Sequence, residues 1–418
     1  MVNLFPKVVK VKALTTLKFY FDSELPESAK VGVRIQGMES YTVEHTPRYR
    51  IDEEERYPVL DLVKHTDYYS LDYSFTSEQK YSITLLVDGK KYGRRLYAFA
   101  LENDLYSKRP YKGDTHLHTC RSDGKGTPFE VGCRYRSAGY DFIAITDHHK
   151  MAPSIEGGRE FSALTDKFAV IQAEEVHNKG MGYFHIINLG GKNSVNEIIE
   201  AGEGFAEGEV ERILSTQVIP EGATPYICAY RTFVSEMIRK GGGLAVMAHP
   251  YWECFGEYNM PYTDVVYLLK QGTYDAIELV AGCDMNGNGN NLQLAVWQEL
   301  LCDGVRIPPL GCSDCHDTES ESDLFNKQFS LVFSDGLDGV LSAISRGFCV
   351  AVEWGGGYDF RAYGSYRLVN YSRFLLDYFY PRYCELSAEH AAALVKRDCE
   401  MIKLAEGKMN DYIQDFFG

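Results

Sequence analysis

The sequence lacks the features of several protein classes. Its 418 residues contain no apolar run as long as the roughly 18 residues of a membrane-spanning helix. Residues 1–7 lack the apolar core of a signal peptide. Positive charge is scarce, because 59 Asp and Glu outnumber 43 Lys and Arg and give a net charge of −16. We therefore expect no membrane partner and no obligate nucleic-acid partner, since phosphate backbones require clustered positive charge.

A disulfide framework and a glycine-rich phosphate loop are also missing. The 11 cysteines are scattered, and Cys312 and Cys315 form a C-x-x-C without a second such pair, which disfavours a zinc ribbon. We expect reduced thiols and a cytoplasmic location. The absence of a glycine-rich loop after the first strand of the α/β region disfavours a nucleotide-binding open sheet.

The length predicts two or three domains. Residues 1–110 have a β-rich pattern, in which Leu17 and Phe19, and later Val31 and Val33, alternate with other residues. Asp88-Gly89 is a hairpin signal. We predict a small antiparallel, β-sandwich-like N-terminal domain.

From residue 111 to residue 355, short apolar strands alternate with helical stretches, which favours parallel strands in an open sheet or a barrel. The expected strands are 112–118, 142–146, 168–173, 184–189, 244–248, 276–280, 307–311 and 348–352. The expected helices are 129–138, 229–240, 262–270, 291–301 and 336–345. Residues 191–224 are interpreted as an insertion, and as a candidate lid, with helical patterns over 195–201 and 209–214. Residues 356–418 form a predicted helical extension, with a long helix expected from Ser387.

Polar residues of metal-ligand type fall at or near the ends of the predicted strands. They are His116, His118, Asp123, Asp147, His148, Glu174, Glu175, His185, His249, Asp314 and His316. Each has an ordinary alternative when taken alone, such as a strand cap, a helix N-cap or a surface carboxylate pair. In a barrel, however, the carboxyl ends of the strands build the active site. The set is too large for one four-coordinate zinc and suits two or three divalent ions, Zn²⁺, Mn²⁺ or Fe²⁺, that share a carboxylate.

This series resembles the motifs of the PHP (polymerase and histidinol phosphatase) family of metallohydrolases. The matching motifs are His116-x-His118 with Asp123, Thr146-Asp147-His148, Glu175, His185, His249-Pro250 and Asp314-x-His316. The resemblance implies an α/β fold with a distorted (β/α)7 barrel and a trinuclear metal site. It also implies that one metal is held by His116, His118, Glu175 and Asp314, a second by Glu175, His185 and His249, and a third by Asp123, His148 and His316.

Two positions depart from the family pattern. Many members have histidine where this chain has Asp123, and a carboxylate there favours a harder metal such as Mn²⁺. The family usually has glycine two residues before the bridging glutamate, where this chain has Ala173. This spacing selects Glu175 over Glu174 as the bridging residue.

We expect a metal-dependent phosphoesterase that uses a hydroxide bridging the metals to cleave a small-molecule or nucleotide phosphoester. Glu175, Asp314 and His316 are the expected catalytic residues. The candidate substrate contacts are Arg121, Lys125, His177 and Trp252, with Arg134 and Tyr251 as weaker candidates. The alternatives are a metal-dependent hydrolase of a carboxylic ester, carbamate or amide, and a non-catalytic, metal-stabilised binding module.

Overall fold

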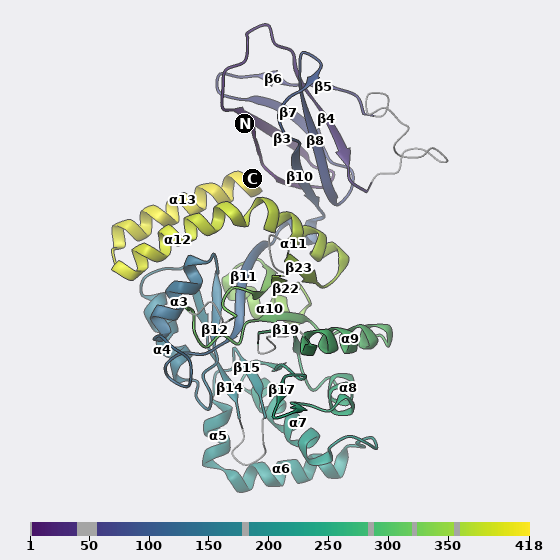
Figure 1. The fold of residues 1–418 in the computed structure, drawn as a ribbon, viewed down its shortest axis with the longest axis vertical. Helices are drawn as coiled ribbons and strands as arrows, with labels where there is room; N and C mark the ends of the chain where they lie inside the picture. Colours follow the sequence, from purple (N-terminus) through teal and green to yellow (C-terminus); the bar gives the residue numbers. More distant parts are fainter. Residues whose placement is uncertain (1, 40–56, 178–183, 283–287, 320–323, 355–359) are drawn as a thin grey trace. The chain divides into compact units, whose positions relative to one another are not determined.

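The computed structural model describes residues 2–39, 57–177, 184–282, 288–319, 324–354 and 360–418, which divide into two compact units. The first unit contains Met1–Lys108, Asn370–Pro381 and Gly407–Gly418, and the second contains Arg109–Val369 and Arg382–Glu406. In Figure 1 the N-terminal strands are purple and the C-terminal helices are yellow.

Two β-sheets of the first unit share one apolar core. One sheet has the order β1-β3-β7-β6, and the other has the order β2-β10-β8-β4-β5 with β9 attached to β8. The strands are β1 (Val2–Phe5), β2 (Val8–Lys10), β3 (Leu14–Phe21), β4 (Val31–Gly37), β5 (Leu60–Asp61), β6 (Val63–Lys64), β7 (Tyr69–Ser74), β8 (Gln79–Val87), β9 (Lys90–Lys91) and β10 (Leu96–Leu101). Leu17, Phe19 and Val33 are fully buried in the shared core, as their alternating pattern predicted. The sandwich architecture itself stays a prediction.

The hairpin at Asp88-Gly89 is confirmed. β8 and β9 pair antiparallel on either side of it, and both turn residues have positive φ angles, 50° for Asp88 and 76° for Gly89. A two-residue hairpin turn of type I′ requires left-handed backbone at both central residues. Aspartate tolerates this conformation, and glycine adopts it without strain.

The C-terminal segment folds into α11 (Tyr366–Tyr378), α12 (Tyr380–Lys396) and α13 (Cys399–Phe417). Our prediction that a long helix starts at Ser387 is wrong, because Ser387 is a buried residue inside α12. The break comes later, at Arg397, whose φ is 52°. There the Asp398 carboxylate accepts hydrogen bonds from the backbone N–H groups of Glu400 and Met401 and so caps the first turn of α13.

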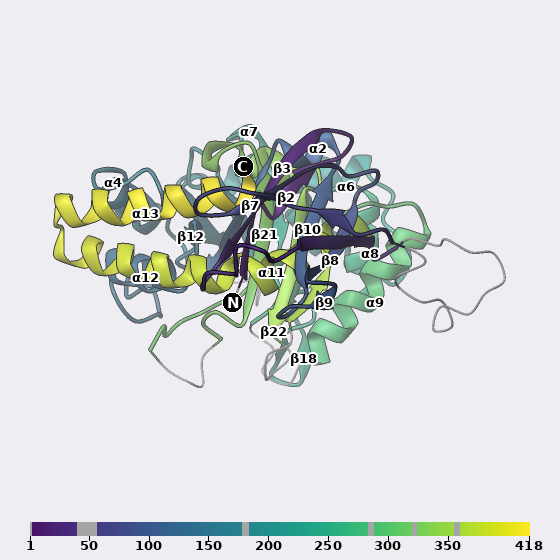
Figure 2. The ribbon, with the colours of Figure 1, turned by 90° about the horizontal axis from the view of Figure 1, so that it is seen from above.

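The second unit contains two mixed β-sheets and a short hairpin. The first sheet has the order β13-β12-β11-β21-β22-β23 and the second has the order β14-β15-β16-β19-β20. Strands β12, β21 and β22 of the first sheet are labelled in Figure 2. The bounds are β11 (Arg109–Leu117), β12 (Phe142–Ile145), β13 (Ala169–Ile171), β14 (Ala173–Val176), β15 (Ile186–Leu189), β16 (Leu244–Met247), β17 (Glu253–Cys254), β18 (Glu257–Tyr258), β19 (Ala276–Ala281), β20 (Pro309–Cys312), β21 (Gln328–Ser334), β22 (Cys349–Trp354) and β23 (Phe360–Tyr363).

Two isolated parallel bridges connect these sheets. One joins Leu117 at the end of β11 to Cys315, and the other joins His148 after β12 to Glu175 in β14. The bridges therefore connect the sheets at the positions of the candidate ligands. The distorted barrel of seven strands stays a prediction for this arrangement.

The expectation of parallel strands throughout is wrong at two places. β15 runs antiparallel to both β14 and β16, and β21, which the sequence pattern did not predict, runs antiparallel to both β11 and β22. Only residues 177–185 separate β14 from β15, a segment too short for the crossover that parallel neighbours need. Glu174 and Glu175 consequently lie within β14, not after the end of a strand.

Helices cover the strands of the second unit. They are α3 (Pro128–Ser137), α4 (Ala152–Ser162), α5 (Val195–Ala201), α6 (Glu203–Thr216), α7 (Pro225–Lys240), α8 (Tyr262–Lys270), α9 (Asn288–Cys302) and α10 (Val340–Ser345), while α2 (Asn103–Tyr106) belongs to the first unit and η2 (Leu337–Gly339) precedes α10. The insertion contains α5 and α6, and Val210 and Ile213 of α6 join the buried core. Among the described helices none has the length and apolarity needed to span a membrane.

Candidate metal centre

The first and last motifs are brought together by backbone hydrogen bonds. The His118 N–H donates to the carbonyl of Cys315, and the Asp314 N–H donates to the carbonyl of His116, both at 2.9 Å. These bonds extend the pairing of β11 beyond its end. As a result, the imidazoles of His116 and His118 lie 3.2 Å and 3.0 Å from the Asp314 carboxylate.

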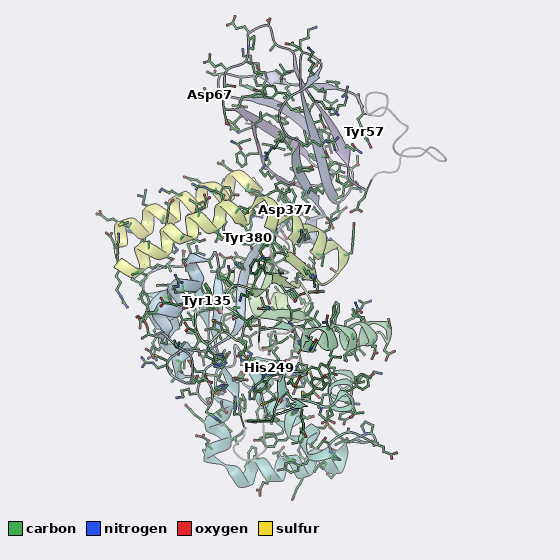
Figure 3. All side chains as sticks on the ribbon, in the orientation of Figure 1. Tyr57, Asp67, Tyr135, His249, Asp377 and Tyr380 are labelled. Atoms are coloured by element: carbon green, nitrogen blue, oxygen red, sulfur yellow. The ribbon has the colours of Figure 1, made fainter. Side chains whose placement is uncertain are left out.

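The Glu175 carboxylate is the centre of the site. Its oxygens lie 2.7 Å from His148 Nδ1 and from His185 Nδ1. Imidazole nitrogens of four further histidines lie at 3.5–3.6 Å, namely those of His116, His177, His118 and His249. His249, labelled in Figure 3, follows β16. One buried carboxylate is thus surrounded by imidazoles from five different segments of the chain.

The donor atoms form four overlapping groups, within each of which all the atoms lie inside 4.8 Å of one another. The groups are His118, Asp123, His148 and His316; His116, His118 and Asp314; His116, Glu175 and His249; and His148, Glu175 and His177. His185 joins them through its contact with Glu175 and a 3.1 Å approach to His249 Nε2. The structure therefore brings all the sequence-predicted ligands to one place. The division among three metals stays a prediction.

The donor atoms match what divalent metals require. Several buried atoms have no hydrogen-bond partner among the described residues, including both oxygens of Glu175, Nδ1 of His118 and of His148, and Nε2 of His177. Buried polar atoms are normally satisfied, so a dense set of unsatisfied carboxylate oxygens and imidazole nitrogens is unfavourable unless a bound ion or ligand satisfies them. Imidazole nitrogens mixed with carboxylate oxygens suit Zn²⁺, Mn²⁺ or Fe²⁺. This centre can hold divalent metal ions.

The electrostatics of the centre depend on mutual pairing. Burial would raise the pKa of Glu175 and of Asp314, but the surrounding imidazoles outweigh it and hold both pKa values well below the usual range. Burial lowers the pKa of His148, yet the Asp123 and Glu175 carboxylates beside the ring outweigh it and raise the pKa to about 10. Similar contacts with Asp123 and Asp314 outweigh burial and raise the pKa of His316 to about 9. Without metal these imidazoles therefore bind protons, which a metal must displace.

The solvent exposure of the candidate ligands increases from one part of the site to another. The side chains of His116 and Glu175 are 0% and 1% exposed, whereas those of Asp123 and His316 are 52% and 36% exposed. The group that contains Asp123 therefore faces solvent.

Two of the candidate ligands adopt unusual backbone conformations. Asp314 has a φ of 51° and His249 has a φ of 22°, and His149, next to His148, has a φ of 61°. Non-glycine residues seldom adopt positive φ, and such residues concentrate at functional sites. Asp314 and His249 thus combine a sparsely populated backbone conformation with a place in the metal centre.

Sequence reasoning missed Glu278, a fully buried residue in the middle of β19. One carboxylate oxygen lies 2.7 Å from His116 Nδ1, and the other accepts a hydrogen bond from the His249 N–H at 3.0 Å. This contact leaves Nε2 of His116 directed toward Glu175 and Asp314. The available signal was a single acidic residue inside the apolar run 276–281.

Glu174 and Asp147 support the site from outside it. Glu174 accepts hydrogen bonds from Asn188, Ser194, Asn196 and the Val195 N–H at the start of α5. Asp147 accepts from both the N–H and the hydroxyl of Thr119, at 2.9 Å and 2.6 Å, and from the Ser122 hydroxyl at 2.5 Å. Asp147 thereby holds the loop that carries Asp123.

The candidate substrate contacts divide into two groups. His177 lies among the ligands, with ring centroids 4.3 Å from His148 and 4.2 Å from His185, and the Trp252 ring lies 5.5 Å from His249. The other candidates make their contacts elsewhere. Arg121 pairs with Glu156, Lys125 pairs with Asp317, Arg134 donates to the Thr318 carbonyl, and buried Tyr251 packs against Tyr258.

The fold and the site thus define this chain as a mixed α/β protein with a centre for divalent metals. No family model and no curated protein matches the chain. Three solved structures are similar to it. One is a two-domain protein from Bacteroides vulgatus, described as containing a predicted PHP-like metal-dependent phosphoesterase. It is 17% identical to this chain with a TM-score of 0.41. The match covers 59% of this chain and 66% of that chain, just under two thirds of its length.

The other two similar structures each match about half of this chain. An amidohydrolase from Chromobacterium violaceum, with bound sulfate and no metal, is 20% identical with a TM-score of 0.35, and the match covers 51% of this chain and 89% of that chain. A protein from Bifidobacterium adolescentis, proposed to be a metal-dependent phosphoesterase, is 17% identical with a TM-score of 0.37, and the match covers 51% and 91%. PHP-like proteins are thus among the structures that this chain is similar to, and theirs is the family whose motifs the sequence resembles.

Proposed function

We propose that this protein is a metal-dependent phosphoesterase with a trinuclear site. The carrying observation is the buried Glu175 carboxylate, which six imidazoles surround at 2.7–3.6 Å, with Asp314 on one side and the solvent-facing Asp123 group on the other. Bound divalent metals supply water that ionises near neutral pH and neutralise the charge on phosphate oxygens.

The residues of the chain have distinct roles in this proposal. Glu175 and Asp314 stay ionised and supply the negative charge that holds the metals. Glu278 holds the ring of His116, so that Nε2 faces the centre. His177 presents a nitrogen without a hydrogen-bond partner among the described residues, and this nitrogen can donate to a substrate oxygen. The Trp252 ring lies 5.5 Å from the ring of His249 and 5.7 Å from that of His185, where it can pack against a substrate group.

The test is an activity assay on the purified full chain with its metal content measured. The substrates are 4-nitrophenyl phosphate, bis(4-nitrophenyl) phosphate and nucleotides, with 4-nitrophenyl acetate and an aryl carbamate as competing classes. We expect metal-dependent cleavage of at least one phosphoester, and its loss in His116→Ala. Cleavage of the acetate or carbamate alone, with metals bound, would establish the carboxylic ester, carbamate or amide alternative.

A further inference from the structure

A groove of about 870 Å³ lies along α3, outside the set of candidate metal ligands. Its walls are one face of α3, one face of α12, and the segment 317–319. This volume is within the range of small-molecule sites, which are mostly apolar pockets of about 300–1,000 Å³. The groove is therefore large enough to take a substantial part of a small molecule.

Small side chains on both helices keep the groove open. α12 contributes Ala388, Ala392 and Val395, which recur at helical spacing, and α3 contributes Cys133 and Ser137 beside Phe129. The α12 residues are exposed, 62% in the case of Val395. An exposed helix face is normally polar. This apolar face is consequently suited to an apolar ligand.

One end of the groove adjoins the solvent-facing part of the metal centre. Lys125 and Asp317 both line the groove and form a 2.8 Å ion pair. Lys125 follows Asp123 by two residues, and its N–H donates to the carbonyl of His316 at 2.6 Å. Lys125, two residues after Asp123, and Asp317, the residue after His316, therefore both border the groove.

The charges of the groove favour a neutral occupant over a second phosphate. Lys125 and Arg134 are its cations, and Glu130, Asp317 and Glu319 are its anions, so no excess of positive charge is available. A phosphate group would meet carboxylates there, whereas an alkyl or aryl chain would meet Phe129 and the alanines of α12.

We propose that the groove binds an extended apolar leaving group of the substrate, while the phosphoryl group occupies the metal centre. This substrate class rests on the proposed phosphoesterase function. α3 has 10 residues and is about 15 Å long, which suits an alkyl chain of roughly ten carbons. The preferred substrate would then be an amphipathic phosphoester.

The test measures binding, so that it does not depend on turnover. Methyl- to decylphosphonate, kept below their micellar concentrations, are titrated calorimetrically into the metal-loaded full chain. We expect affinity to rise about two- to fourfold with each added methylene until the groove is full. Ala392→Trp places an indole in the groove and should bring the ratio of decyl- to methylphosphonate affinity close to one. Leu404→Trp is the matched control, because Leu404 is 64% exposed on α13 and lines no part of the groove, and it should keep the wild-type ratio.

The outcomes separate this inference from the proposed function. Affinity that does not depend on chain length, a ratio that survives Ala392→Trp, or no binding at any length overturns the groove assignment. If small phosphoesters are cleaved in that case, the proposed function stands alone. A chain-length gain that Ala392→Trp removes, without cleavage of any phosphoester, supports the groove and overturns the phosphoesterase.

Discussion

At the residue scale, two neighbouring glutamates have opposite environments. Glu175 faces the histidines, whereas Glu174 faces the first turn of α5. The alternation of side chains along β14 puts them on opposite faces of the strand. The two residues therefore allow a matched comparison between a candidate metal ligand, Glu175, and a structural carboxylate, Glu174.

We expect Glu175→Gln to lose metal and Glu174→Gln to keep it. The first change removes the central negative charge and should weaken metal affinity by more than the roughly 10–100-fold cost of losing a group that only supports a ligand. The second leaves metal stoichiometry intact and lowers the free energy of unfolding by about 1–3 kcal/mol. Metal analysis and denaturant unfolding measure the two effects. Equal metal loss in both variants would contradict the assignment of Glu175.

Glu278 supports a different prediction, because it touches His116 and not the metal position. Glu278→Gln should lower metal affinity about 10–100-fold while leaving the unfolded fraction small, since the amide preserves the size of the side chain. The measurement is competition with a metal-sensitive chelator. Glu257→Gln, at an exposed position in β18, is the control and should behave as wild type. Unchanged affinity in Glu278→Gln would mean that His116 is oriented by other contacts.

At the scale of elements, α12 is fastened to α3 by a buried polar contact. Arg136 of α3 donates from Nε to His390 Nδ1 at 3.0 Å and pairs with Asp141 at 3.1 Å, while Lys112 N–H donates to the other Asp141 oxygen. His390 must remain neutral to accept this bond. The groove between the two helices depends on their being held at this spacing.

The pH dependence of stability should report this contact. Burial, together with Arg136 and Lys167, lowers the pKa of His390 to about 3, and Glu406, 3.4 Å away, does not reverse the shift. The unfolded chain binds the proton near pH 6.5, so the stability from neutral His390 is complete above that pH and is lost as pH falls from 6.5 toward 3, by at most about 1.4 kcal/mol per pH unit.

His390→Gln checks this dependence, because glutamine can accept from Arg136 without titrating. Free energies of unfolding are measured from pH 7 to pH 4 for both proteins. The free energy of unfolding should decline less steeply with falling pH in the variant, and the slopes of the two curves should become equal as pH approaches 7. Parallel curves for the two proteins would show that His390 is not held neutral.

At the scale of the whole molecule, the metal centre joins segments from His116 to His316, all within the second compact unit. Metal should therefore stabilise that unit, because bound ions satisfy Glu175 and the imidazoles around it. We expect chelation to lower the unfolding temperature by several degrees, since metal at 100 times its dissociation constant contributes about 2.7 kcal/mol.

Differential scanning calorimetry with and without chelator measures this effect. Glu175→Gln is the control and should show little further change on chelation, because its metal is already lost. An unfolding temperature that chelation does not alter in the wild-type protein would contradict a bound metal in the folded state.

Local patterns were sufficient for part of the fold and of the candidate site. Alternation placed β3 and β4 correctly, Asp88-Gly89 marked its hairpin, and the helices around residues 129–138 and 229–240 followed from periodicity. These features depend on neighbours in sequence, which is why the sequence could predict them. The position of β21 depends on its distant partner β11 and was missed. The break between α12 and α13 at Arg397 was also missed, although it depends on local contacts, the positive φ of Arg397 and the cap that Asp398 provides.

The sequence by itself determined which side chains are able to bind metal, because donor chemistry belongs to each residue. Only the tertiary structure decided which of them meet. The β14–β15 register turned Glu175 toward the histidines. The packing of one sheet against the other brought Glu278 of β19 against His116 of β11, 162 positions earlier. The groove beside α3 likewise exists only because α12 returns to it. Long-range contacts of this kind arise from packing and burial, which no local pattern encodes.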